Sequence, residues 1–265
     1  MHIDDLAQIQ DIYDHVYLSP HLDDAALSCG GAIARNGGAQ ARVLVVTICT
    51  AAPSPEGPFS SLAEELHRTW GLAPTEVVSV RLHEDEMAME RLGADSYWAG
   101  MLDAIYRRPD AYNSNETMFG QPAPDDPLSP ALRAFIRALS ERVPSATLYA
   151  PLGVGGHVDH QITHDAALSV AGPTVAFYED FPYVAKPQAL DLRLQALDAE
   201  FVTSTIDIDA TLTRKIGAIE AYASQIVSLF GDAETMRRMV VEYAEALRPD
   251  VGTYGERLWL RVVPA

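Results

Sequence analysis

The sequence predicts an α/β fold, with a mostly parallel β-sheet covered by helices on both of its faces. Short apolar segments alternate along the chain with longer segments in which apolar residues recur at helical spacing. The segment ARVLVVTICT, residues 41–50, is apolar at nearly every position, as expected of a strand that is buried on both faces. Ligands bind outside the carboxyl ends of the strands in such sheets, so we expect functional residues directly after the strands.

The apolar segments give the expected strands, and the segments with helical spacing give the expected helices. The strands are predicted at residues 15–19, 41–50, 75–82, 146–153, 173–184, 201–208 and 256–263. The helices are predicted at residues 25–37, 60–72, 83–93, 129–143, 157–172, 209–223 and 233–247. Ser60 or Ser61 is suited to begin the second of these helices, and Gly93 to end the third.

Two further segments are expected to be loops. Residues 51–60 follow the second predicted strand, and residues 109–130 are rich in Pro, Asn and Asp. A loop of about 20 residues in a compact domain is often functional. Each loop therefore either shapes a pocket or forms a solvated excursion from the surface.

The composition is typical of a globular enzyme and argues against several other classes of protein. Hydrophobic residues make up 48% of the 265 residues, and charged residues make up 21%. The formal net charge of −18 would repel a phosphate backbone, so nucleic-acid binding is not expected. No apolar run is long enough to span a membrane and the acidic N-terminal segment is unlike a signal peptide, so we expect a cytoplasmic protein. Cys29 and Cys49 form no CxxC pair and are expected to be buried free thiols.

Two motifs, PHLDD and HVDH, place ionisable side chains directly after predicted strands. The motifs contribute His21, Asp23, Asp24, His157, Asp159 and His160. Imidazoles and carboxylates are good Zn²⁺ ligands, and a catalytic zinc needs three protein ligands and an open position for water. His21, Asp24 and one further histidine would supply the ligands, leaving a carboxylate as a base and a second histidine to stabilise developing charge. The residues alone permit other assignments, because an isolated DD or HxDH motif also occurs at capped helix starts.

The paired motifs resemble those of the PIG-L/LmbE family of zinc-dependent N-deacetylases. The family pattern is PHxDD near the N-terminus and HxDH in the second half, and the resemblance extends to about residue 185. Members act on N-acetylglucosaminyl phosphatidylinositol, on the sugar precursors of mycothiol and bacillithiol, and on glycosylated antibiotics. The resemblance implies a Rossmann-like α/β fold and one domain over residues 1–265, in which the C-terminal third, about 186–265, is less diagnostic.

The resemblance also implies a role for each motif residue. The ligands of Zn²⁺, or of Fe²⁺ or another divalent metal in its place, would be His21, Asp24 and His160. Asp23 would be the general base. His157 would stabilise the tetrahedral oxyanion or protonate the amine, and Asp159 would orient His157.

Two positions depart from the family pattern. The glutamate that commonly follows DD is Ala25 here, and the tyrosine that some relatives carry two residues before the first histidine of HxDH is Gly155. The first change affects support of the metal site rather than metal binding. Because position 155 is a glycine, any stabilisation of the substrate carbonyl oxygen comes from another residue or is absent.

Other residues have both a functional and a structural interpretation. By resemblance, Arg81 at the end of the third predicted strand and Asp103 would bind substrate; the alternatives are a surface ion pair for Arg81 and a helix N-cap at Asp103. His164 is expected to be structural, because three ligands are already assigned. Glu179 and Asp180 either line the pocket or belong to an ordinary loop.

We therefore predict a hydrolase that removes an N-acyl group, most simply acetyl, from an amino sugar or a similar polar small molecule, in thiol-cofactor or natural-product metabolism. Nothing in the motifs recognises the acyl group, so an amidase acting on an antibiotic or siderophore intermediate is the alternative. A non-catalytic binding protein is a weaker alternative, because every expected ligand and the base are present. A nucleotide-binding protein is not expected without a G-x-G-x-x-G motif. A homo-oligomer is compatible with the sequence.

Overall fold

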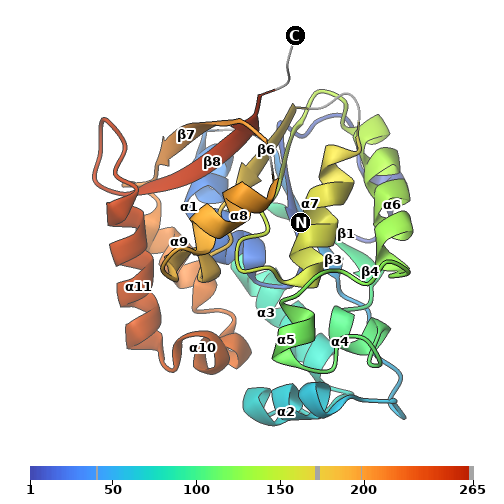
Figure 1. Cartoon of the computed structure of the whole chain (residues 1–265). Coiled ribbons are helices and arrows are strands. Elements are labelled where there is room, and N and C mark those ends of the chain that lie inside the picture. The colour runs from blue at the N-terminus through green and yellow to red at the C-terminus, as the bar shows by residue number, and fades with distance from the viewer. Residues whose placement is uncertain (40, 171–173, 198, 263–265) are drawn as a thin grey trace.

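The computed structural model describes residues 1–39, 41–170, 174–197 and 199–262 and contains an eight-stranded sheet (Figure 1). The strands are β1 (His2–Ile3), β2 (His15–Ser19), β3 (Val43–Cys49), β4 (Asp95–Met101), β5 (Thr147–Pro151), β6 (Thr174–Tyr178), β7 (Phe201–Asp207) and β8 (Gly255–Arg261). Their order is β1-β4-β3-β2-β5-β6-β8-β7. Strands β1 to β6 all run parallel to one another, whereas β8 is antiparallel to both β6 and β7. The predicted α/β fold with a mostly parallel sheet is confirmed.

Helices cover both faces of this sheet (Figure 1). The α-helices are α1 (Asp24–Gly38), α2 (Ser61–Trp70), α3 (Val77–Leu92), α4 (Ala104–Arg107), α5 (Asn115–Met118), α6 (Leu128–Arg142), α7 (Val158–Leu168), α8 (Ala189–Leu197), α9 (Leu212–Ile219), α10 (Ala223–Phe230) and α11 (Ala233–Ala246). Helices α6 and α7 pack together on one face, and α1, α3 and α9 pack together on the other. None of the helices in the described ranges is both long and apolar enough to cross a membrane.

Strand β3 shows how the sequence fills both cores. Leu44, Val46 and Ile48 belong to the cluster that contains α6 and α7, whereas Val43 and Val45 belong to the cluster that contains α1 and α3. All seven residues of β3 are buried, as the continuous apolar run predicts.

Two predicted helix boundaries are confirmed. The Ser60 hydroxyl accepts a hydrogen bond from the backbone N–H of Ala63 at the start of α2 (3.2 Å). Gly93 ends α3 with φ of 74°, a left-handed conformation that a glycine adopts without steric cost.

The predicted strand at 75–82 is wrong, because these residues begin the long helix α3. The β-branched valines there suggest a strand, but the buried residues of α3 recur at helical spacing. They are Val77, Arg81, Glu84, Asp85, Ala88, Met89 and Leu92. The strand that pairs with β3 at this point is β4, which has the polar sequence DSYWAGM and was not predicted. Arg81 therefore lies on a helix and not at the end of a strand.

Other differences concern shorter elements. The elements β1, α4, α8 and α10 were not predicted, the predicted strand 173–184 ends at Tyr178, and the expected loop 109–130 contains the short helix α5 and the start of α6. Residues 171–173 and 263, which also belong to predicted elements, lie outside the described residues.

The strand order places a binding crevice between β2 and β5. The chain runs from β2 outward to β3 and β4, and then returns to the other side of β2 to form β5. Such a reversal of strand order leaves a crevice at the carboxyl ends of the two central strands. The PHLDD motif follows β2 and the HVDH motif follows β5, so both motifs reach this crevice.

Candidate active site

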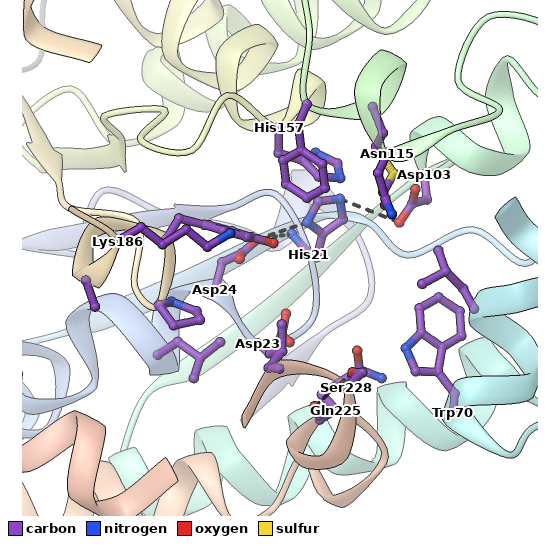
Figure 2. Close-up of a pocket in the computed structure, with 18 of the residues that line it drawn as sticks. His21, Asp23, Asp24, Trp70, Asp103, Asn115, His157, Lys186, Gln225 and Ser228 are labelled. Atoms are coloured by element: carbon purple, nitrogen blue, oxygen red, sulfur yellow. Dashed lines mark hydrogen bonds and ion pairs between the residues drawn. The ribbon is translucent and has the colours of Figure 1, made fainter. Parts of the chain in front are cut away.

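The six motif residues from the two strand ends lie together beside a cavity of about 510 Å³, and Figure 2 shows His21, Asp23, Asp24 and His157 in its wall. His21, Asp23, Asp24 and His157 line the cavity directly, and each is at most 8% exposed. His160 and Asp159 lie deeper, with 1% and 0% exposure. The sequence prediction that the two motifs meet is confirmed.

Asp24 is the point at which the three expected metal ligands meet. Its Oδ2 atom lies 3.1 Å from His21 Nδ1 and 3.2 Å from His160 Nε2, and it accepts a hydrogen bond from the His21 backbone N–H (2.8 Å). Burial alone would raise the pKa of Asp24, but the His160 and His21 rings outweigh burial and hold it well below its usual value. An ionised oxygen therefore faces two imidazole nitrogens.

His160 carries a buried nitrogen that is suited to a metal. Its Nε2 makes no hydrogen bond with any residue that the structure describes, even though Asp24 lies close. Its Nδ1 lies 2.6 Å from Oδ1 of Asp180, and Oδ2 of Asp180 accepts hydrogen bonds from the backbone N–H groups of Gly153 and Val154 (2.8 Å each). A carboxylate behind one ring nitrogen fixes the tautomer that leaves the other nitrogen free to bind a metal. Asp180 thus supports His160 from behind and does not line the cavity.

Among the described residues, two sets of three side chains have ligand atoms that all lie close enough together to hold an ion, and neither is the predicted set His21, Asp24 and His160. The ring nitrogens of His21, His157 and His160 lie within 4.8 Å of one another, and so do ligand atoms of His21, Cys49 and Asp159. The second set is a poor metal site, because burial raises the pKa of the Cys49 thiol well above its usual value and Asp159 already pairs with a cation. The first set shares two members with the predicted ligands and differs in having His157 in place of Asp24.

Asp159 occupies a different position from the one expected by resemblance. Its carboxylate does not contact the His157 ring; its Oδ2 lies 3.1 Å from His21 Nε2, and its Oδ1 accepts a hydrogen bond from Arg107 (2.6 Å). What reaches His157 is the backbone N–H of Asp159, which donates to His157 Nδ1 (3.2 Å) because His157 is the N-cap of α7. The side chain of Asp159 is therefore bonded to His21 and not to His157.

His157 is held as a neutral donor at the wall of the cavity. Burial, and after it the neighbouring His21 ring, lower the pKa of His157 well below its usual value. Because Nδ1 accepts the hydrogen bond from Asp159, the neutral ring carries its proton on Nε2.

Asp23 and Arg81 face each other at the opposite side of the cavity. Asp23 stands at the N-cap position of α1, but its carboxylate accepts no capping hydrogen bond from the helix. The nearest cation is Arg81, whose Nη2 lies 3.5 Å from Asp23 Oδ1 and whose guanidinium lies 5.6 Å from the Trp70 ring centroid. Burial raises the pKa of Asp23 to about 6 against the lowering effect of Arg81. A surface ion pair for Arg81 is excluded by its burial, at 8% exposure.

Asp103 combines the two interpretations that the sequence allows. Its Oδ1 accepts a hydrogen bond from the Ile105 N–H and caps α4 (3.1 Å), while its Oδ2 lies 3.5 Å from His21 Nε2 and the residue lines the cavity (Figure 2). His164 has a structural position, because it is fully buried and its Nδ1 lies 3.0 Å from the carbonyl oxygen of Pro151. Cys29 and Cys49 are buried and free, as predicted.

Tyr183 is a cavity residue that the sequence analysis missed. Its ring packs edge-on against His160 (centroids 5.9 Å apart), and no described residue is hydrogen-bonded to its hydroxyl. The sequence feature that points to Tyr183 is Gly155, because a Cβ atom at position 155 would lie 2.6 Å from Tyr183 Cβ. The missing side chain at 155 leaves the space that Tyr183 occupies.

The remaining walls of the cavity come from segments with no motif. One wall is apolar and is built by α2, α4, α5 and the residue after α5. It consists of Leu66, Trp70, Ile105, Met118 and Phe119. The C-terminal third supplies further polar and apolar residues, including Lys186, Gln225, Ser228, Leu229 and Met239. Figure 2 shows Gln225 and Ser228 between Asp23 and Trp70, and Lys186 on the side away from Trp70. The expected loop 109–130 thus shapes the cavity through its helix α5.

Comparison with known proteins gives one family and closely related enzymes. The sequence profile of the PIG-L family, described as GlcNAc-PI de-N-acetylase, matches residues 16–171. The chain is 33% identical over 215 residues to the 2'-N-acetylparomamine deacetylase of Streptomyces fradiae, covering 78% of this chain and 72% of that protein. It is 27% identical over 246 residues to the enzyme of the same name from Niallia circulans, covering 85% and 86%.

Solved structures of two other deacetylases have the same fold. The zinc-inhibited form of teicoplanin deacetylase superimposes with a TM-score of 0.80 at 30% identity, covering 94% of this chain and 99% of that chain. The deacetylase of the A40926 pseudoaglycone gives a TM-score of 0.76 at 29% identity, covering 96% and 99%. Both alignments include the C-terminal third, which the sequence motifs do not reach.

Proposed function

The chain belongs to the PIG-L family of de-N-acetylases, and we propose that it hydrolyses the N-acetyl group of an amino sugar carried by a natural product. The observation that carries this proposal is the convergence of Asp24 with His21 and His160 beside one cavity, with Asp23 and His157 on its walls. Relatives named for 2'-N-acetylparomamine and for teicoplanin support an amino sugar as the substrate class.

A divalent metal fits the residues present, and we propose Zn²⁺ held by His21, Asp24 and His160. One carboxylate and two imidazoles are a donor set that zinc uses in catalytic sites. The buried Nε2 of His160, without a hydrogen bond to any described residue, is the orphaned atom that such an ion would satisfy. A bound divalent metal would polarise the amide carbonyl and lower the pKa of water.

The protein's own residues supply the proton transfers. Asp23, next to Asp24 and outside the ligand set, accepts a proton from the attacking water; a carboxylate with a raised pKa is suited to hold that proton near neutral pH. Asp23 then delivers the proton to the amine nitrogen, which is a poor leaving group until it is protonated. We assign this delivery to Asp23 rather than to His157, because the depressed pKa of His157 leaves its ring neutral.

Two uncharged donors would stabilise the oxygen of the carbonyl as negative charge develops there. The Nε2–H of His157 is one, and the hydroxyl of Tyr183, which also lines the cavity, is the other. Donors that are fixed before the reaction stabilise developing charge strongly in a site that excludes water. Tyr183 would thus stabilise the carbonyl oxygen in place of the tyrosine that some relatives carry at the position of Gly155.

We propose that Arg81 and Asp103 bind the sugar and that the apolar wall around Trp70 contacts the rest of the substrate. Asp103 Oδ2 is placed to accept a hydrogen bond from a hydroxyl, and Arg81 to donate one. We also propose that residues 1–265 act as a single domain, because the C-terminal third completes the cavity with Gln225 and Ser228.

A substrate screen tests the proposal. The metal-loaded protein is incubated with N-acetylated amino sugars, including 2'-N-acetylparomamine and N-acetylglucosamine derivatives, and acetate and free amine are measured together. We expect equal amounts of the two products, and no products from His160→Ala, which should lose the metal. If the protein hydrolyses other amides but no acetyl amide, the alternative is favoured. That alternative is an amidase that acts on an antibiotic or siderophore intermediate. Metal binding without turnover of any amide would favour a binding protein.

A further inference from the structure

We propose that Arg107 and Asp126 position the metal ligand His21 through the carboxylate of Asp159, so that the segment 109–127 is anchored to the metal centre. The inference rests on the proposed metal site, and it concerns residues that none of the motifs contains. Arg107 and Asp126 are positioning residues, because neither lines the cavity.

The His21 ring contacts the carboxylate of Asp159. Nδ1 of His21 faces Asp24, and Nε2 on the other side of the ring lies 3.1 Å from Asp159 Oδ2. A histidine that binds a metal through one nitrogen needs an acceptor for the N–H of the other, and this acceptor fixes the tautomer and the rotation of the ring. Asp159 therefore does for His21 what Asp180 does for His160.

Other groups hold the carboxylate of Asp159 in place. This carboxylate is completely buried, and both of its oxygens are bonded to other groups. Arg107 Nη2 donates to Oδ1 (2.6 Å), and the backbone N–H of Ala104 donates to Oδ2 (3.0 Å). The carboxylates behind the two histidines are held in different ways. Oδ2 of Asp180 is held by backbone N–H groups alone, whereas Asp159 depends on the Arg107 cation from another segment.

Arg107 is in turn paired with Asp126. The guanidinium makes a bidentate pair with Asp126, from Nε to Oδ1 (2.7 Å) and from Nη2 to Oδ2 (2.9 Å). Asp126 is 2% exposed and also accepts hydrogen bonds from the Tyr112 hydroxyl (2.7 Å) and the Leu128 N–H (2.9 Å). The two ends of the segment 109–127 thus close on one guanidinium, and this guanidinium points at the acceptor of His21.

The neighbouring pair of residues provides a matched control. Arg108 pairs with Asp125 (2.8 Å) from the same two ends of the segment, but the Asp125 side chain is 77% exposed and neither residue contacts Asp159. Both pairs join the two ends of the segment 109–127, so a purely structural effect of this closure would appear in variants of either pair. Only the Arg107–Asp126 pair can act on His21.

The experiment measures Zn²⁺ affinity in the full-length metal-free protein, by competition with a chromogenic chelator, for Asp126→Asn, Arg107→Lys and the control Arg108→Gln. Mutation of a group behind a metal ligand costs about 10–100-fold in metal affinity, so we expect a loss of about tenfold in the first two variants. Arg108→Gln should stay within about twofold of the wild type. The melting temperature of each metal-free variant is measured alongside, and Arg107→Lys keeps a charge beside both carboxylates if Asp126→Asn does not fold.

The outcomes separate this inference from the proposed function. Wild-type Zn²⁺ affinity in folded Asp126→Asn and Arg107→Lys would overturn the positioning role while leaving the metal site intact. An equal loss in Arg108→Gln would also overturn it, because the effect would then come from the segment as a whole. Absence of Zn²⁺ binding by the wild type would instead overturn the proposed metal site, and the inference with it.

Discussion

The substitution Asp23→Asn separates a catalytic base from a helix cap more sharply than any other change in this chain. Asp23 stands at the N-cap position of α1, where a structural role would be ordinary. Its carboxylate nevertheless accepts no capping hydrogen bond, lines the cavity and has Arg81 as its nearest cation. Asparagine keeps the size and shape of the side chain and an oxygen for Arg81, but removes the basic oxygen.

The expected loss in kcat follows from the value of a positioned base. General acid–base catalysis contributes about 10²–10⁴ in rate, which is roughly 3–5 kcal/mol of barrier at about 1.36 kcal/mol per tenfold. We therefore expect kcat of Asp23→Asn to fall by about this factor in a continuous assay of amine release. KM and the metal content, measured by mass spectrometry, should change little, because Asp23 lies outside the proposed ligand set. Asp24→Asn should instead lose the metal.

A true helix cap provides the control. Asp232 caps α11 through a hydrogen bond from the Thr235 N–H (2.7 Å) and lies far along the chain from both motifs. Asparagine caps a helix about as well as aspartate, so Asp232→Asn should leave both stability and kcat nearly unchanged. If Asp23→Asn behaves in the same way at full metal occupancy, the base assignment is refuted and Asp23 is a structural residue.

Three further substitutions test other parts of the account. Tyr183→Phe should lower kcat by about 10-fold or more, since single donors to a developing oxyanion are worth up to about 10²–10³; unchanged kcat with full metal content would rule out the hydroxyl as a donor. Met118→Ala should raise KM about fivefold, equivalent to about 1 kcal/mol of lost apolar contact, with metal content unchanged; loss of metal would show that α5 supports the metal site and not the substrate. Burial, aided by Arg193, lowers the pKa of His164 from 6.5 to about 4. The unfolded chain then binds more protons between these pH values, so acidification from pH 6.5 to 4 costs up to about 3 kcal/mol of folding free energy. This part of the acid sensitivity should be absent in His164→Gln, measured by urea unfolding at several pH values, and an identical pH dependence in the two proteins would contradict the assignment.

The centre of the site could be predicted from the sequence, because its residues directly follow strands that the local apolar pattern identifies. A parallel sheet brings the residues after β2 and β5 to the same edge, so the two motifs could be placed together from the strand pattern alone, whereas the choice of His160 as the partner of His21 came from the family resemblance. The continuous apolar runs also identified β2, β3 and β5 correctly, since strands buried on both faces contain few polar residues.

The parts that could not be predicted depend on contacts that leave no periodic pattern. β-branched valines favoured a strand at 75–82, but the burial of Arg81 and Glu84 in hydrogen-bonded positions on α3 overrides this local preference. The family resemblance pairs Asp159 with His157, whereas the structure places the Asp159 carboxylate beside His21, because a helical start points the side chains of residues 157 and 159 in different directions. Tyr183 and Arg107 reach the site from separate segments, and only the folded chain brings them there.

The position of a bound metal ion would identify its ligands without any assumption about the motifs. Anomalous diffraction at the zinc edge, from crystals of the metal-loaded protein, locates the ion without reference to any assumed ligand. We expect one strong peak at bonding distance, about 2.0–2.2 Å, from Nδ1 of His21, Nε2 of His160 and a carboxylate oxygen of Asp24. A peak bonded to His157 in place of Asp24, or one between Cys49 and Asp159, would contradict this expectation.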